Sequence, residues 1–226
     1  MKTMFGNRVM VKLDPENEFI ITPSGTKLFV DTTFEPEKHV VRAGVVERIP
    51  RQLYFNDAPW TTDMEIKVGD RVYMYFLAIQ NCLAPERKQY IREGQTVWIF
   101  IKYHNIYCVE REGKIIPING YILVEPMEDP AWIQQKEKMG KIGLDAPDLR
   151  GLSKTDVTYG RIAYLGKPNI SYKDDYKRDT ECDVKQGDAI IMKKIRDIPV
   201  EYEYHAKIDG GRKLYRIQRH DILATL

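Results

Sequence analysis

Cysteine and histidine are scarce in this chain. Three cysteines and four histidines occur among 226 residues, and Cys82, Cys108 and Cys182 are widely spaced with no Cys-x-x-Cys motif. This spacing argues against a disulfide framework and against a structural zinc site. No local grouping of cysteine and histidine indicates a catalytic pair either. We therefore expect a protein that is not an enzyme and that carries no metal ion or other cofactor.

A surplus of charge is also missing. The chain has 35 Lys and Arg against 33 Asp and Glu, a formal net charge of +2. Proteins that attract nucleic acid in bulk carry a clear basic surplus, so we expect no nucleic-acid partner. No apolar run approaches the roughly 18 to 20 residues of a membrane span, and the first residues lack the apolar core of a signal peptide. We expect a soluble, cytoplasmic protein without a membrane partner.

What the chain does contain is alternation of apolar and polar residues. β-Branched and aromatic residues recur at every second position, which is typical of strands. These segments are residues 8–13, 44–49, 71–76, 96–101, 121–125, 161–165, 189–192 and 213–217. Turns rich in Gly, Pro and Asp separate them, so the sequence predicts an all-β protein of barrel or sandwich type. Residues 132–139 could form a short helical turn, but we do not predict a helix there.

Four short motifs occur twice in the same order, at offsets of 113 to 118 residues. The matched positions are Val9 with Ile122, Gly44 with Gly160, Asp70 with Asp188, and His104 with His220. Such ordered repetition indicates a tandem duplication, with one β-barrel domain in residues 1–113 and a second in residues 114–226. Because a strand opens each unit and a His-x-Ile motif closes it, we expect the first and last strands of each barrel to pair.

The segment between the first two strands of each repeat is long and polar. In the first repeat it spans residues 14–42 and carries the apolar triplet Leu28, Phe29 and Val30. A stretch of this length without clear secondary structure suggests a functional loop. One interpretation is a mobile loop whose triplet docks into a groove of a partner, and the other is an ordinary strand packed in the barrel. The residues alone leave both interpretations open.

Taken together, these motifs resemble those of the GroES-type co-chaperonins, the chaperonin-10 family, and the resemblance covers nearly the whole chain twice. The matching segments are residues 7–12 for the opening strand, 25–30 for the loop core, 44–46 for the glycine-led strand, 67–72 and 183–190 for the Gly-Asp turn, and 220–224 for the closing element. The resemblance implies two tandem GroES-like, partly open β-barrels, each with a long mobile loop. It also implies a cap for an ATP-driven chaperonin ring.

The resemblance further implies which residues bind the chaperonin. Leu28, Phe29 and Val30 match the loop triplet of the family, and Ile142, Gly143 and Leu144 are its counterpart in the second repeat. Gly143 interrupts the second triplet, which puts binding by that loop in doubt. The implied partners are a GroEL-type chaperonin ring, an unfolded client protein and further copies of the chain in a homo-oligomeric ring. Residues 50–65 and 167–183 lie where the family places a hairpin of the dome roof.

A different class of function is a β-barrel module that is structural or binds nucleic acid, without chaperonin affinity. Pairs such as Tyr103 with His104 and Arg212 with Lys213 favour nucleic acid, whereas the balanced charge opposes it. A bacteriophage structural protein that reuses the fold is a related alternative, and bacterial, plastid and phage origins all stay open. The number of chains per ring, the client and the cognate chaperonin are not specified by these residues.

Overall fold

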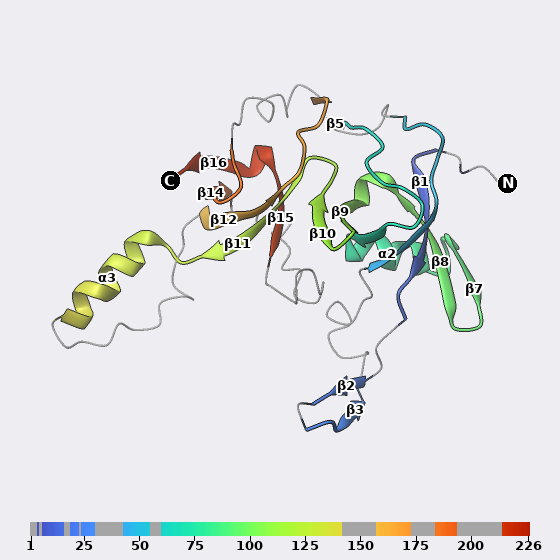
Figure 1. Cartoon of the computed structure of the whole chain (residues 1–226), viewed down its shortest axis with the longest axis horizontal. Coiled ribbons are helices and arrows are strands. Elements are labelled where there is room, and N and C mark those ends of the chain that lie inside the picture. Colours follow the sequence, from blue (N-terminus) through green and yellow to red (C-terminus); the bar gives the residue numbers. More distant parts are fainter. Residues whose placement is uncertain are drawn as a thin grey trace.

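The all-β prediction is confirmed by the computed structural model, which consists mainly of two antiparallel sheets (Figure 1). The described residues are 4, 6–15, 19–22, 24–29, 43–54, 60–141, 157–172, 184–193 and 214–226. Within these ranges neither sheet closes into a barrel, since each has two edge strands. No helix in the same ranges is long and apolar enough to cross a membrane.

Seven strands form the first sheet. They are β1 (Arg8–Leu13), β4 (Ala43–Arg48), β6 (Arg71–Met74), β7 (Tyr90–Glu93), β8 (Thr96–Lys102), β9 (Ile106–Arg111) and β10 (Lys114–Pro117). Their order across the sheet is β10-β9-β6-β4-β1-β8-β7. The predicted domain boundary after residue 113 falls between β9 and β10, and β10 pairs with β9.

Five strands form the second sheet. They are β11 (Tyr121–Met127), β12 (Val157–Leu165), β14 (Ala189–Lys193), β15 (Tyr215–Gln218) and β16 (Ile222–Thr225). Their order is β15-β11-β12-β14-β16, which read backwards matches β9-β6-β4-β1-β8 of the first sheet strand for strand. The internal repeat in the sequence therefore corresponds to a shared strand order.

Irregularities of the ladders recur at equivalent places as well. The pairing of β1 with β4 shifts register between Met10 and Val11, and that of β11 with β12 shifts between Leu123 and Val124. A second shift interrupts both the β6–β9 and the β14–β16 ladders. Since bulges bend a strand and re-aim its side chains, the two sheets share their curvature as well as their order.

The Gly-Asp turn that the sequence repeats has the same hydrogen bonds in both halves. The Asp70 carboxylate accepts a bond from the backbone N–H of Lys67 at 2.7 Å, and Asp188 accepts one from Lys185 at 2.7 Å. The glycine before each aspartate has a φ of 91° and 95° respectively, a conformation that favours glycine. These turns set the chain direction at the start of β6 and β14.

The predicted pairing of the first and last strands is wrong. β1 has β4 and β8 as its neighbours, and β11 has β12 and β15. The reason is a 3₁₀ turn at each histidine motif, η1 (Tyr103–Asn105) and η5 (Arg219–Asp221), which divides the closing element into two strands. The strand before the turn pairs with the opening strand, and the strand after it pairs with β6 or β14.

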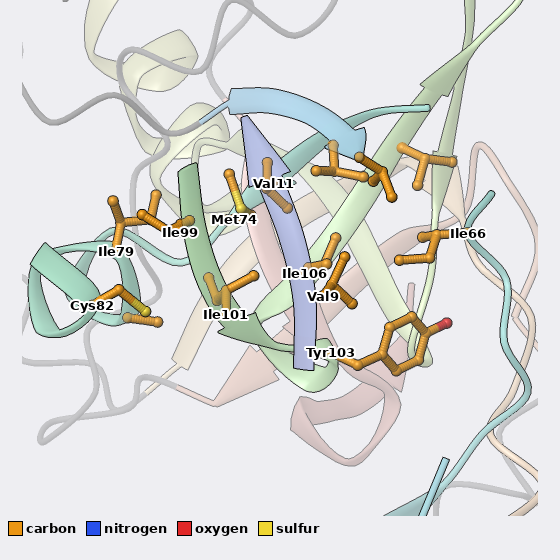
Figure 2. Packing of buried hydrophobic residues seen from close by; sticks show 14 of the residues in the cluster. Val9, Val11, Ile66, Met74, Ile79, Cys82, Ile99, Ile101, Tyr103 and Ile106 are labelled. Carbon is orange, nitrogen blue, oxygen red and sulfur yellow. The ribbon is translucent and has the colours of Figure 1, made fainter. Parts of the chain in front are cut away.

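The core of the first half lies against the inner face of its sheet (Figure 2). Val9 and Val11 of β1 and Ile99 and Ile101 of β8 alternate with outward-facing neighbours and are fully buried. This period-two pattern is the one from which the strands were predicted. A smaller core of the same kind lies in the second half around Ile122, Val124 and Ile190.

A helix absent from our prediction covers part of the first core. α2 (Phe76–Leu83) lies between β6 and β7 in the chain and packs against β8. Its residues Ile79 and Cys82 point toward Ile99 and Ile101 in Figure 2 and are buried. The burial shows that this segment completes the core of the first half.

The two halves contact each other through an apolar cluster. It includes Ala43, Tyr73, Tyr107 and Cys108 of the first sheet and Leu123 and Leu214 of the second half, all buried. The Arg216 guanidinium lies 4.4 Å from the ring centre of Tyr75 and 5.4 Å from that of Tyr107. A cation held over aromatic faces adds attraction to this apolar contact.

A short ladder also joins the halves at the segments expected to form the dome roof. β5 (Trp60–Thr61) pairs with β13 (Ser171–Tyr172). The hydroxyls of Thr61 and Ser171 lie 2.6 Å apart, and the Ile170 N–H donates to the Thr61 carbonyl at 2.8 Å. The described parts of the two expected roof segments are thus hydrogen-bonded to each other.

Candidate functional site

The first predicted binding triplet begins in a small hairpin that stands apart from both sheets. β2 (Phe19–Ile21) pairs antiparallel with β3 (Lys27–Phe29), so Ile20 faces Leu28 in the register. In Figure 1 the hairpin lies below the first sheet. Leu28 is therefore on a strand, as the second interpretation held, but on a strand that belongs to neither sheet.

Hydrogen bonds among small polar residues close the hairpin. The N–H of Thr22 donates to the Thr26 carbonyl at 2.9 Å, and the N–H of Gly25 donates to the Thr22 carbonyl at 2.8 Å. The Thr22 hydroxyl accepts a bond from the N–H of Thr26 at 3.0 Å and lies 2.8 Å from the Ser24 hydroxyl. Gly25 has a φ of 81°, which a glycine adopts without strain. The turn thereby holds β2 and β3 together.

The exposure of Leu28 is the main chemical feature of the hairpin. Half of its surface, 50%, is open to solvent. Phe29 is described by its backbone alone, as the register partner of Phe19. Val30, Ile142, Gly143 and Leu144 lie outside the described residues. The structure thus brings one predicted contact residue to an accessible strand.

An ion pair marks the point at which the hairpin segment leaves the first sheet. Asp14, next after β1, accepts hydrogen bonds from both terminal guanidinium nitrogens of Arg71, one of them at 3.0 Å. The N–H of Asp14 also donates to the carbonyl of Ala43, the first residue of β4, at 3.1 Å. Because Arg71 is the first residue of β6, this contact fixes both ends of the segment to three strands of the sheet.

In the second half a helix follows the first strand in place of a hairpin. α3 (Pro130–Lys141) has no buried residue and projects from the end of β11 (Figure 1). The Asp129 carboxylate accepts a bond from the N–H of Ala131 at 2.8 Å, and Lys136 pairs with Glu128 at 3.2 Å. An acidic capping residue followed by Pro is a usual helix start. The expectation of no helix at residues 132–139 was therefore wrong.

Within the described ranges, no group of three His, Cys, Asp or Glu side chains could hold a metal ion. Cys82 and Cys108 are buried, and burial raises the pKa of both thiols. Their reactive thiolate forms are thereby disfavoured.

No known family's sequence model and no curated protein matches this chain.

Proposed function

We propose that the protein is a cytoplasmic co-chaperonin, which caps an ATP-driven chaperonin ring, assists folding of an enclosed client and catalyses no reaction itself. The observation that carries the proposal is a half-exposed leucine on a hairpin that stands apart from both sheets. The motif order of the sequence, repeated in two halves with the same strand order, supports it. Copies of the chain associate in a homo-oligomeric ring around the chaperonin opening.

In this proposal Leu28, Phe29 and Val30 contact the chaperonin. Full burial of one such side chain is worth about 1.5 to 3 kcal/mol, so the exposed half of Leu28 accounts for roughly 1 kcal/mol. A single hairpin therefore binds weakly, and several hairpins presented by a ring bind tightly because the later contacts are intramolecular. Weak individual contacts also let the cap leave when the chaperonin changes its conformation.

The two halves of the chain are unequal in this role. Ile142, Gly143 and Leu144 are the proposed counterpart of the first triplet, and they directly follow α3. A helix before the triplet and a glycine within it both distinguish this segment from the β2–β3 hairpin. We infer that the first half supplies the stronger chaperonin contact.

The proposal is tested by capture of the full chain on a bacterial chaperonin with and without ATP. We expect capture that depends on ATP, and at least a tenfold loss of it in Leu28→Asp, because a carboxylate opposes docking in an apolar groove. Phe29→Asp should likewise abolish chaperonin-assisted refolding of a denatured client.

A matched control is Ser24→Asp, which adds the same charge to the hairpin and keeps an oxygen beside the Thr22 hydroxyl. This variant should be captured as well as the unmodified chain. Equal capture of Leu28→Asp and the unmodified chain would refute the assignment of the site. No capture of the unmodified chain, together with nucleic-acid binding that falls steeply with salt, would favour the nucleic-acid-binding class instead.

A further inference from the structure

The turn that links the two sheets is hydrogen-bonded to both halves of the chain. It consists of residues 118–120, between β10 and β11, and we call it the joint. Asn119 at its centre is fully buried, and its side-chain Nδ2 donates to the carbonyls of Tyr103 and Ile106 at 3.0 and 2.7 Å. The Asn119 carbonyl accepts a bond from Gln218 Nε2 of the second half at 3.0 Å. Asn119 therefore connects the two halves.

A carboxyl group of the first half also contacts the joint. Oε2 of the half-buried Glu65 accepts a bond from the N–H of Asn119 at 2.8 Å and lies 3.4 Å from the Thr62 hydroxyl. The Glu65 backbone is held as well, since its N–H donates to the Tyr103 hydroxyl and its carbonyl accepts from Arg111 Nη2, both at 2.9 Å. These bonds keep the Glu65 carboxyl group at the joint.

One acceptor of the joint lacks a donor. Asn119 Oδ1 is buried and accepts no hydrogen bond from any described residue, although the N–H, the Nδ2 and the carbonyl of Asn119 are all bonded. A buried acceptor without a donor is unfavourable. An ionised Glu65 cannot supply the donor because a carboxylate only accepts, whereas a neutral Glu65 carries an O–H.

The charges that face Glu65 oppose one another. Lys167 of the second half favours the ionised carboxylate, whereas Asp63, two residues earlier in the chain, disfavours it. Burial raises the pKa of the Tyr103 hydroxyl, so this group stays uncharged. The Arg111 guanidinium contacts the Glu65 carbonyl and not its carboxylate. The ionised form of Glu65 is thus not secured by an ion pair of its own.

We propose that the joint is a proton-sensitive contact, in which a neutral Glu65 donates its O–H to Asn119 Oδ1 and holds the two halves together more tightly. The acid then pairs with Asn119 twice, through the existing N–H bond and through the added O–H bond. A proton from solvent joins the carboxylate, and no covalent bond other than this O–H forms or breaks. This inference goes beyond the proposed function, since it concerns one chain and holds or fails whether or not a chaperonin binds.

The pKa of Glu65 gives the direction of the pH dependence. Burial is the largest influence on it and raises it above the ordinary value, outweighing the bonds from Asn119 and Thr62. The folded chain therefore binds this proton more tightly than the unfolded chain. The resulting stabilisation is complete below the ordinary pKa and is lost as the pH rises through the raised one. The joint is tightest in acid and loosens as Glu65 ionises.

Glu65→Gln tests the proposal, because its amide has the shape of the neutral acid and carries a donor at every pH. Urea unfolding of this variant and of the unmodified full chain is compared between about pH 4 and about pH 8.5, a range that spans the ordinary pKa of a glutamate. We expect the folding equilibrium constant of the variant to be about fivefold larger at the high end, with the difference closing at the low end. Glu86→Gln, the same change at an exposed residue, should show no difference at either end.

Asn119→Gly separates the proposed bond from mere removal of a buried charge. Glycine adopts the φ of 57° found at Asn119 and keeps the N–H, but it lacks Oδ1. In this background the gain from Glu65→Gln should largely disappear. Should this variant not fold, the Glu65 carboxyl carbon followed by NMR in the unmodified chain should titrate above the ordinary pKa. A Glu65→Gln variant less stable at every pH, an undiminished gain in Asn119→Gly, or titration of Glu65 at or below its ordinary pKa would each overturn the proposal.

Discussion

The glycine that begins the second motif of each repeat offers a quantitative test of the strand packing. Gly44 lies opposite Leu13 where β4 pairs with β1, and a Cβ built on it would be 2.4 Å from the Lys12 carbonyl oxygen and 2.7 Å from Val11 Cγ1. At the equivalent Gly160 the nearest atoms are Val124 Cγ1 at 2.3 Å and Met192 Cε at 2.9 Å. Both positions are therefore closed to any side chain unless neighbours move.

The two sites differ in which atoms must move. At Gly44 the nearest obstacle is backbone, so Gly44→Ala must shift β1 against β4 by roughly 1 Å and weaken the ladder between them. Overpacking costs about 1 to 3 kcal/mol, and each weakened hydrogen bond adds about 0.5 to 1.5 kcal/mol. We expect Gly44→Ala to lower the free energy of unfolding by about 3 kcal/mol. Gly160→Ala should cost less, about 1 to 3 kcal/mol by overpacking, since its two nearest obstacles are side-chain atoms and the nearest backbone atom, the Glu125 carbonyl oxygen, is 3.0 Å away.

Urea unfolding followed by tryptophan fluorescence measures these differences. For a chain of this length, about 3 kcal/mol corresponds to a fall of roughly 6 to 12 °C in the melting temperature. Gly140→Ala is the control, because nothing lies within 4 Å of a Cβ at that helical position, and it should cause no loss of stability. A Gly44→Ala variant as stable as the unmodified chain, within 0.5 kcal/mol by the linear extrapolation, would refute the close approach of β1 and β4.

Two further predictions concern buried hydrogen bonds of the first half. The hydroxyl of Tyr103 accepts from the N–H of Glu65 and donates to the Asp63 carbonyl, both at 2.9 Å, so Tyr103→Phe should cost about 1 to 3 kcal/mol in urea unfolding; an unchanged midpoint would contradict this. Burial by itself raises the pKa of Asp70, but the bonds from Arg111, the shorter at 2.5 Å, and from the turn outweigh burial and hold the pKa below its ordinary value. The charged Asp70 carboxylate therefore stabilises the fold at a pH above its ordinary pKa, and this stabilisation is lost as the pH falls through the lowered pKa. We expect Asp70→Asn to make the free energy of unfolding fall less steeply at acid pH. An acid decline as steep as that of the unmodified chain would contradict this.

Strand positions followed from the sequence because half-buried strands alternate in polarity. Val9, Val11, Ile99 and Ile101 show this alternation, and all four are in the core. α3 carried a helix-start signal at Asp129, but no residue of this polar helix is buried, so the sequence showed no core-facing apolar stripe to confirm it. α2 was not predicted because its apolar residues pack against β8. A contact between segments far apart in the sequence cannot be recognised from the sequence of the helix alone.

The candidate site was predictable only in part. The apolar triplet in a long polar segment left a docking loop and an ordinary packed strand both open, and only the resemblance to the co-chaperonins made Leu28 a contact residue. The structure exposes that side chain. The pairing of β2 with β3 was not predicted, since the strands are short and the segment reads as irregular.

The sequence by itself determined the all-β class, the positions of most strands and the repetition of four motifs in a second half, because these depend on local alternation and on residue identity. Only the tertiary structure decided which strands are neighbours, since the 3₁₀ turns at His104 and His220 redirect the chain. It alone decided that Tyr73 is buried between the halves and that Leu223 is half exposed, because burial between halves depends on contacts far apart in the chain. Local chemistry therefore specified the elements, and long-range packing specified which of their faces meet.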